Sequence, residues 1–204
     1  MRPGVYMAQM GRKMKIYLLD RNQTLVSIWK LYFREEGEVT VVCDDFRHFM
    51  ETTPVECVVS PANSYGLMDG GYDLAISEWF GWELQEKVQR HILEHYRGEQ
   101  PVGTSFIIDT GVRGIKLIHT PTMRIPSAIK DSMVVYQCMR TCLMTALDNQ
   151  IESIVIPAFG GFCGCVPPQI LCEMMFEAYR QIMNPPEELN WEYACRWEPE
   201  NKAF

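Results

Sequence analysis

The sequence contains no continuous run of about 18 apolar residues, and this absence excludes a membrane-crossing helix. The basic amino-terminal stretch, residues 1–15, also lacks a continuous apolar segment, so we expect no secretory signal. Internal repeats and low-complexity segments are missing as well. Of the 204 residues, 47% are hydrophobic and 22% are charged, which is typical of a soluble globular protein with one domain.

Positive charge is scarce. Lys and Arg total 19 against 26 Asp and Glu, which leaves a formal net charge of −7. Because a net acidic protein repels polyanions at long range, we expect neither nucleic acid nor a membrane surface as a partner. Local backbone groups can still hold a few phosphates, since net charge does not forbid a local anion site.

CxxC pairs are absent, although the chain has eight cysteines. Most of them lie in apolar stretches, a pattern that indicates reduced and buried thiols rather than a disulfide framework. Such thiols are typical of reducing compartments, so we expect a cytoplasmic protein. The cysteines are Cys43, Cys57, Cys138, Cys142, Cys163, Cys165, Cys172 and Cys195.

Apolar and amphipathic stretches alternate along the chain, and this alternation predicts an α/β fold. Short apolar stretches predict strands at 15–19, 39–43, 55–60, 105–109, 115–119 and 154–156. Helical spacing of apolar residues predicts helices at 25–33, at 73–97, from 131 to 146 and from 167 to 182. Strands that alternate with helices of this length imply a largely parallel central sheet with flanking helices.

Two glycine-containing loops follow predicted strands, at 60–73 and 157–167. In open α/β sheets, ligands bind outside the carboxyl ends of the strands, where such loops meet. Glycines allow backbone amides to approach a phosphate, and helix amino termini favour anions. Neither loop matches a Walker A sequence or GxGxxG, and glycine also serves ordinary turns. A diphosphate-containing ligand is the hypothesis that both loops together favour.

An ordered set of motifs extends over most of the chain, from about 39 to 182. The motifs are Asp44-Asp45-Phe46, Ser60-Pro61-Ala62-Asn63-Ser64, Gly70-Gly71-Tyr72-Asp73, Leu117-Ile118-His119-Thr120 and Gly160 to Gly164. This set resembles the macro domain, an ADP-ribose-binding α/β/α module, and implies three layers with a mostly parallel mixed sheet. We therefore expect 1–204 to be one domain with a core at about 39–183, an amino-terminal strand-helix extension at 1–38 and a tail at 184–204.

The resemblance implies a binding role for each matched position. Asp45 would accept a hydrogen bond from the adenine amino group, with the Phe46 amide nearby, and Asn63 would hold the distal ribose. The backbone of the two loops would pass close to the diphosphate and the ribose. The positions implied to bind the ligand are Asp45, Phe46, Ala62, Asn63, Gly70, Gly71, Gly160, Gly161, Phe162, Cys163 and Gly164.

Hydrolysis of an ADP-ribose derivative is the activity that the resemblance implies, with Asn63 and Asp73 as the catalytic pair. Asp73 matches the acidic residue that hydrolytic members place near the distal ribose, where it could orient or activate water. The substrate would be an ADP-ribosylated acidic side chain, O-acetyl-ADP-ribose or ADP-ribose 1″-phosphate. The residues require no metal and no organic cofactor, and the expected partner is ADP-ribose or an ADP-ribosylated molecule.

Other interpretations remain open for the protein and for single residues. Ser60 stands where relatives have Asn, and the second loop is altered, so a non-catalytic ADP-ribose reader is the alternative. A structural protein with a vestigial pocket is a further one. Asn63 could only cap a turn, and Asp73 could serve as a helix cap. His119 lies in an apolar strand and is expected to be a core histidine rather than a base.

Overall fold

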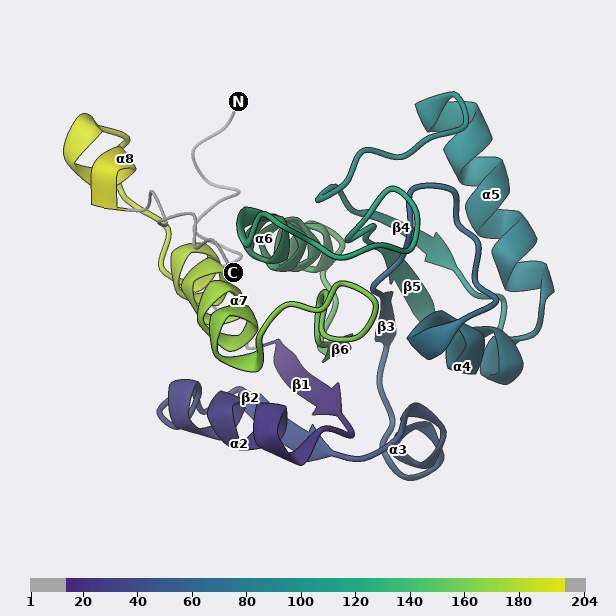
Figure 1. The fold of residues 1–204 in the computed structure, drawn as a ribbon, viewed down its shortest axis with the longest axis horizontal. Coiled ribbons are helices and arrows are strands. Elements are labelled where there is room, and N and C mark those ends of the chain that lie inside the picture. Colours follow the sequence, from purple (N-terminus) through teal and green to yellow (C-terminus); the bar gives the residue numbers. More distant parts are fainter. Residues whose placement is uncertain (1–13, 197–204) are drawn as a thin grey trace.

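The computed structural model describes residues 14–196, and a six-stranded sheet forms its centre (Figure 1). The strand order is β2-β1-β6-β3-β5-β4, with β4 antiparallel to β5 and all other neighbours parallel. This arrangement confirms the expected mostly parallel mixed sheet. The strands are β1 (Lys15–Asp20), β2 (Val39–Cys43), β3 (Cys57–Ser60), β4 (Phe106–Asp109), β5 (Lys116–His119) and β6 (Ser153–Pro157).

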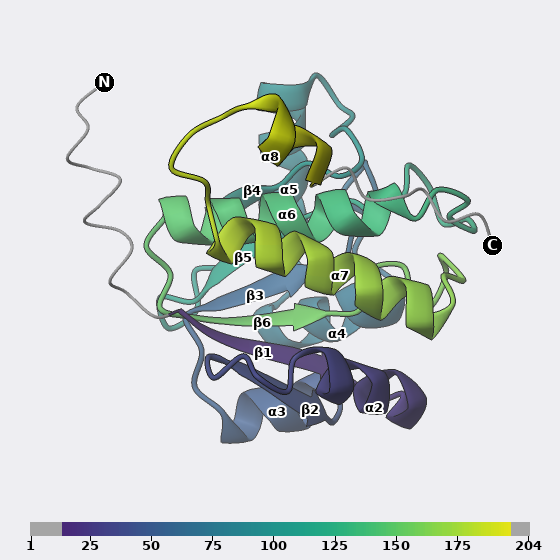
Figure 2. The same cartoon turned by 90° about the vertical axis from the view of Figure 1, so that its left-hand side faces the viewer.

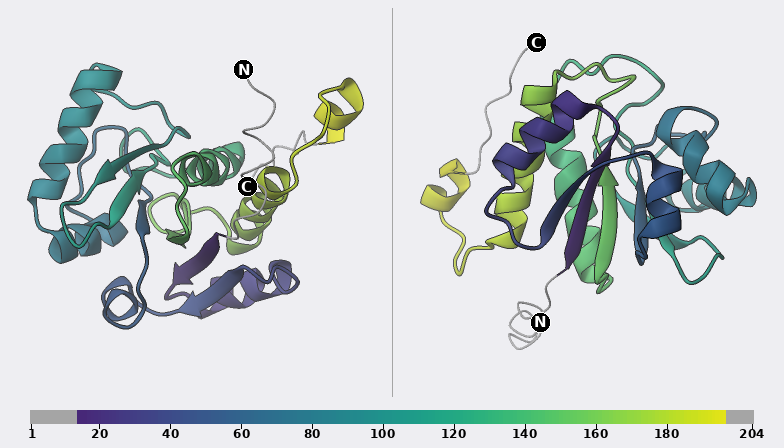
Figure 3. Two further views of the ribbon diagram at one scale, coloured as in Figure 1. Left: turned by 180° about the vertical axis from the view of Figure 1, so that it is seen from behind. Right: turned by 90° about the horizontal axis from the view of Figure 1, so that it is seen from below.

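Helices cover both faces of the sheet, which confirms the three-layer α/β/α architecture (Figures 2 and 3). One face carries α2 (Gln23–Tyr32), α6 (Met133–Asp148) and α7 (Pro168–Met183). The other face carries α3 (Phe46–Thr52), α4 (Gly71–Phe80) and α5 (Glu83–Tyr96), and the short α8 (Trp191–Arg196) follows α7. Among the described residues, none of these helices is long and apolar enough to cross a membrane.

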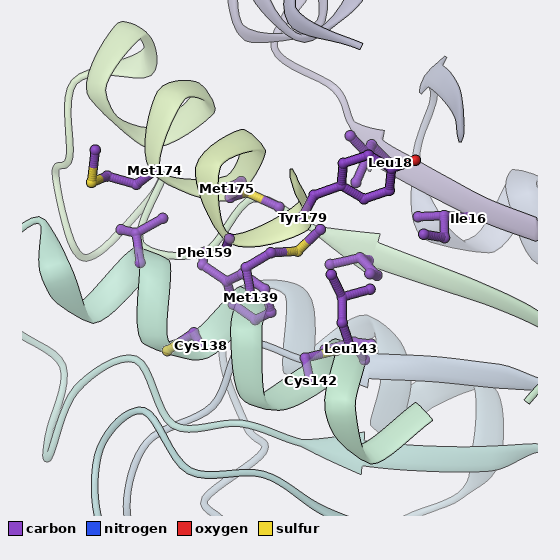
Figure 4. Close-up of a cluster of buried hydrophobic side chains, with 14 of the residues drawn as sticks. Ile16, Leu18, Cys138, Met139, Cys142, Leu143, Phe159, Met174, Met175 and Tyr179 are labelled. Carbon is purple, nitrogen blue, oxygen red and sulfur yellow. The ribbon is translucent and has the colours of Figure 1, made fainter. Parts of the chain in front are cut away.

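Side chains of β1 alternate between the two cores, as the period of two in a strand requires. Ile16 and Leu18 belong to the cluster under α2, α6 and α7, whereas Tyr17 and Leu19 belong to the opposite one. Methionines such as Met139 and Met175 fill the first cluster beside Phe159 and Tyr179 (Figure 4). Met174 and Met175 of α7 are therefore core residues.

Segment 1–38 was expected to lie outside the shared core, and its described part is integral to the sheet. β1 lies between β2 and β6 and pairs with both over its length. The start of α2 is fixed by Asn22, whose side chain accepts hydrogen bonds from the amides of Thr24 and Leu25. Trp29 of α2 is fully buried. This strand and helix therefore support the centre of the fold.

The predicted helix at 73–97 is wrong in its continuity, because the structure contains two helices there. Gly81 ends α4 with φ +93°, a conformation that favours glycine and interrupts the helical backbone. α5 begins at Glu83 and runs to Tyr96. The apolar stripe continues across the break, so Phe80 and Leu84 both enter the same core and conceal it in the sequence.

Cysteine burial differs from the expectation for half of the thiols. Four cysteines are buried, and none of the eight forms a disulfide. Cys163 and Cys165 are exposed because they belong to the loop after β6 rather than to an element of the core. Cys43, at the end of β2, and Cys195, in α8, are exposed as well.

Candidate functional site

Strands β3 and β6 are neighbours, and the chain leaves them toward opposite faces of the sheet (Figure 1). The loop after β6 leads to α7 on one face, and the loop after β3 leads to α4 on the other. The two strands pair only through Cys57 with Ile154 and Val58 with Val155. Ligands of open α/β sheets bind at such a switch point, outside the carboxyl ends of the strands. Both glycine loops therefore lie where a ligand site is expected.

Gly70 and Gly71 begin α4 and leave open space beside the backbone. A Cβ atom added at either position would meet no atom within 4 Å. Gly71 has φ +57°, which favours glycine. The amino terminus of α4 has no side-chain cap, whereas Asn22 caps α2 and Asp45 caps α3. The first amides of α4 are therefore available to an anionic group.

Asn63 uses its side chain inside the loop after β3. Its Oδ1 accepts hydrogen bonds from the amides of Tyr65 at 3.1 Å and Leu67 at 3.3 Å. Its Nδ2 donates to the carbonyl oxygen of Leu67 at 2.7 Å. These contacts hold a turn of the kind that Asn commonly stabilises. The structural role left open for Asn63 is thus present, and the residue is only 8% exposed.

Asp73 lies in the first turn of α4 and contacts the end of β3. Ser60 Oγ donates a hydrogen bond of 2.6 Å to Asp73 Oδ1, and both residues are buried. Burial raises the pKa of Asp73 to about 7, and the hydrogen bond from Ser60 acts in the opposite direction. Because this pKa is near neutral, the carboxyl group can take up or release a proton under ordinary conditions. No side-chain cap of α4 is formed by Asp73.

Glycines of the loop after β6 are packed within the protein. A Cβ on Gly164 would lie 2.6 Å from the carbonyl oxygen of Gly160, and one on Gly160 would lie 2.7 Å from Ile129 Cδ1. Gly161 has the Ala158 side chain 3.2 Å from the corresponding position. Within the described part of the chain, no acceptor pairs with the backbone amides of 161–164. The loop therefore offers consecutive unpaired donors at the switch point, as an anion site requires.

Aromatic and sulfur side chains of the same loop point to solvent. Phe162 is 82% exposed, and Cys163 is exposed as well. The Phe162 ring is therefore not part of the loop interior, and it is free to lie against a bound molecule.

The segment between β5 and α6, residues 120–132, connects both loops, and it was not selected as a site from the sequence. Ala62 donates its amide to the Thr120 carbonyl at 3.1 Å, and Ser64 donates to that of Met123 at 3.1 Å. At the other end, the Ile129 amide donates to the Gly164 carbonyl at 2.8 Å. These three hydrogen bonds join backbone atoms, so side-chain patterns in the sequence do not reveal them.

The proposed adenine end begins where β2 passes into α3. Asp45 is exposed, and its Oδ1 accepts a hydrogen bond of 3.0 Å from the His48 amide as the cap of α3. Phe46 is buried, and its ring lies edge-on to that of Tyr72 with centroids 5.2 Å apart. This ring contact joins the start of α3 to the start of α4. Asp45 precedes one of these two rings in the sequence, and the Gly70-Gly71 pair precedes the other.

Asp20 ends β1 at the same edge of the sheet, and the sequence alone did not single it out. Its carboxylate accepts a hydrogen bond of 2.7 Å from the Asn22 amide, and burial raises its pKa. A carboxylate directly after an apolar strand was the signal available. With Asp73, Asp20 makes this edge rich in partly desolvated carboxyl groups.

His119 is a core residue, as expected. It is fully buried, and its Nδ1 contacts Gln100 Oε1 at 2.7 Å. Because Gln100 Nε2 donates to Thr104, its Oε1 accepts and Nδ1 carries the proton. Burial lowers the pKa of His119 to about 3, so the imidazole is neutral.

One further hollow of the described structure lies away from these loops. A hollow of about 180 Å³ lies at the opposite edge of the sheet, beside the Lys116–Asp109 ion pair. Among residues 14–196, no three His, Cys, Asp or Glu side chains gather as metal ligands.

Comparisons with known proteins agree with this geometry. A family model described as Macro domain matches residues 59–175. An uncharacterized protein of Aquifex aeolicus is 31% identical over 128 residues, which are 62% of this chain and 74% of that protein. The macrodomain of Mycobacterium tuberculosis DarG has a TM-score of 0.55 at 20% identity, covering 64% of this chain and 85% of its own. A variant of the Oceanobacillus iheyensis macrodomain with ADPR has a TM-score of 0.58 at 20% identity, covering 66% and 74%.

Proposed function

The chain belongs to the macro domain family, and from this membership we propose that it binds ADP-ribose and hydrolyses an ADP-ribose derivative. The Oceanobacillus iheyensis relative in the fold comparison carries ADPR, which supports the ligand class. The substrates proposed are an ADP-ribosylated acidic side chain, O-acetyl-ADP-ribose and ADP-ribose 1″-phosphate. All three share the nucleotide, the diphosphate and a modified distal ribose.

The main observation in support of the proposal is that two sets of backbone amides without hydrogen-bond partners lie at one switch point of the sheet. The amides of 161–164 lack acceptors within the described chain, and those at the start of α4 lack a cap. A diphosphate placed between them would receive hydrogen bonds from both loops, which are strong because the acceptor is charged. Local donors of this kind are needed because the whole protein carries −7.

This placement of the diphosphate determines where the adenine and the distal ribose would lie. The adenine would lie toward Asp45 and Phe46, next to the start of α3. The distal ribose would lie toward Gly70 and Gly71, where the backbone leaves open space. Asp73 follows in the same turn of α4, so a buried carboxyl group lies two residues after this ribose contact. Asn63 supports this end by holding the turn at 63–67.

The reader alternative has an observation in its favour. The side-chain oxygen of Asn63 already accepts hydrogen bonds from two backbone amides, and Asp73 Oδ1 accepts one from Ser60. If both side chains serve only the structure, the site binds ADP-ribose without turning over a derivative.

Calorimetry and a product assay together test the proposal. ADP-ribose is titrated into the protein, and each candidate substrate is incubated with it while the released ADP-ribose is quantified. Binding together with turnover supports the hydrolase. Binding without turnover of any of the three leaves only the reader. The absence of binding at millimolar ligand would contradict both and leave the vestigial pocket.

A further inference from the structure

Two buried side chains from different elements meet beside the proposed ribose end of the site. Ser60 is the last residue of β3, and Asp73 lies in the first turn of α4. The Ser60 hydroxyl donates to Asp73 Oδ1 at 2.6 Å, and Ser60 has no exposed surface. Asp73 keeps 7% of its surface exposed, and no described residue donates a hydrogen bond to its Oδ2. One oxygen is therefore held, and the other remains free.

The surroundings of this carboxyl group disfavour its charged form. No Lys, Arg or His of the described chain stabilises the Asp73 carboxylate. Tyr72 and Asp20 face the same region, since both Asp73 and Asp20 raise the pKa of the buried Tyr72 phenol. The uncapped start of α4 favours an anion there, but more weakly than burial disfavours it. Below about pH 7, the neutral carboxylic acid is therefore the main form of Asp73 in the ligand-free protein.

We propose that Ser60 is a positioning residue, whose hydroxyl orients Asp73 so that the carboxyl proton resides on Oδ2 and faces the sugar end of the ligand. The proposal rests on the proposed function and deepens it, because it makes Asp73 a proton donor rather than a base that activates water. Oδ1 accepts from Ser60, so the proton of the neutral acid belongs on the other oxygen. By stabilising the carboxylate formed after proton transfer, Ser60 also keeps the acid within reach of neutral pH.

In a substrate whose substituent is linked through oxygen to C1″ of the distal ribose, the C1″–O bond breaks. Its electron pair goes to the leaving oxygen, which takes the proton from Oδ2. The oxygen of a water molecule bonds to C1″, and a proton of that water returns to Oδ2. One water is consumed, ADP-ribose and the protonated leaving group are released, and Asp73 is again neutral.

Carboxyl ¹³C NMR on the full chain with ¹³C-labelled aspartate tests the pair without any substrate. The Asp73 resonance is assigned by its loss in Asp73→Asn and followed from about pH 5 to about pH 9. We expect a midpoint near 7 in the wild type. In Ser60→Ala the midpoint should rise by about one pH unit or more, because a hydrogen bond to the carboxylate is lost. Ser60→Thr keeps the hydroxyl and should restore the wild-type midpoint.

Ser77→Ala is the matched control. Ser77 is also fully buried on α4, but its hydroxyl donates to the Met68 carbonyl at 2.8 Å instead of to a carboxyl group. Its removal should leave the Asp73 midpoint unchanged. Circular dichroism of each variant verifies that the fold is retained. A wild-type midpoint at an ordinary aspartate value, or equal midpoints in the wild type and Ser60→Ala, would overturn the positioning role.

The pH profile of turnover decides the proton-donor role. The rate should fall as pH rises through the midpoint measured by NMR, and the fall should move upward in Ser60→Ala. A rate that rises through the same midpoint would show that Asp73 acts as a base and would refute the donor role. Absence of turnover would refute the hydrolase and the donor step, while the NMR titration would still decide whether Ser60 controls Asp73.

Discussion

The backbone amide of Ile129 donates a hydrogen bond of 2.8 Å to the carbonyl oxygen of Gly164. The Ile129 side chain reaches the same loop, since a Cβ on Gly160 or on Gly164 would lie 2.7 Å from its Cδ1. The segment between β5 and α6 thus contacts the loop after β6 through both the backbone and the side chain of Ile129. The unpaired amides of 161–164 depend on this support for their arrangement.

Gly164→Ala should disrupt the loop after β6. The new Cβ would lie 2.6 Å from the Gly160 carbonyl oxygen, which is backbone and cannot move without the loop. We expect a loss of about 1–3 kcal/mol in the free energy of unfolding, as for other overpacked sites. ADP-ribose binding should weaken at the same time. Urea unfolding and calorimetry measure the two effects, and a variant of wild-type stability and affinity would contradict the packing described.

Gly70→Ala should affect binding without affecting the fold. Gly70 has φ −146°, which any residue adopts, and a Cβ there would meet no protein atom within 4 Å. Stability should therefore stay within about 0.5 kcal/mol of the wild type. The added methyl group would occupy space beside the proposed ribose contact and weaken ADP-ribose binding by about tenfold. Unchanged affinity in calorimetry would place the ligand away from this turn.

Asp73→Asn should change how the free energy of unfolding depends on pH. The folded pKa of about 7 lies above the ordinary value of 3.8, so the folded protein binds more protons than the unfolded chain between these values. The contribution of Asp73 to the free energy of unfolding is therefore fully present below about pH 4, and it is lost as pH rises toward about pH 7. The neutral amide avoids the loss and should make the variant more stable by about 2–4 kcal/mol at pH 8.

Urea unfolding of the wild type and Asp73→Asn at about pH 5 and about pH 8 measures this difference. Comparison of the two proteins cancels the opposite contribution of carboxylates such as Asp109, whose pKa is lowered by its contact with Lys116. If the difference in unfolding free energy between the two proteins is the same at both pH values, the pKa of Asp73 is not raised by folding.

Asn63→Ala should destabilise the turn after β3. The change removes one acceptor and one donor, and leaves the amides of Tyr65 and Leu67 without their partner. We expect a loss of about 1–3 kcal/mol in unfolding free energy, with weaker ADP-ribose binding as a consequence. Wild-type stability combined with lost binding would show instead that the side chain acts on the ligand directly.

Two substitutions at Asp45 separate its capping role from its proposed contact with adenine. Asp45→Ala removes the cap of α3 and should cost about 1 kcal/mol in unfolding free energy. Asp45→Asn keeps a capping oxygen and should fold normally, but should discriminate less between ADP-ribose and its hypoxanthine analogue, which lacks the amino group. Calorimetry with both ligands measures the discrimination, and an unchanged ratio would remove Asp45 from base recognition.

Much of the fold was predictable because its local signals agree. The alternation of apolar strands with amphipathic helices predicted the parallel sheet, and apolar spacing predicted a helix from 167 to 182, close to α7 (Pro168–Met183). The break between α4 and α5 escaped prediction because the apolar stripe passes Gly81 without interruption. The positive φ of Gly81 marks this break in the structure, and apolar spacing carries no information about backbone dihedral angles.

The amino-acid sequence by itself determined which residues follow the strands of the sheet, because hydrophobic periodicity and the positions of glycines are local properties. That both glycine loops meet at one edge follows from parallel strands alone. Only the tertiary structure decided what each glycine does: Gly70 and Gly71 leave open space, whereas Gly160 and Gly164 are packed against Ile129. Only it decided the state of Asp73, since burial and the contact with Ser60 require β3 and α4 to pack together. Desolvation and close packing depend on neighbours distant in sequence, and no local pattern encodes them.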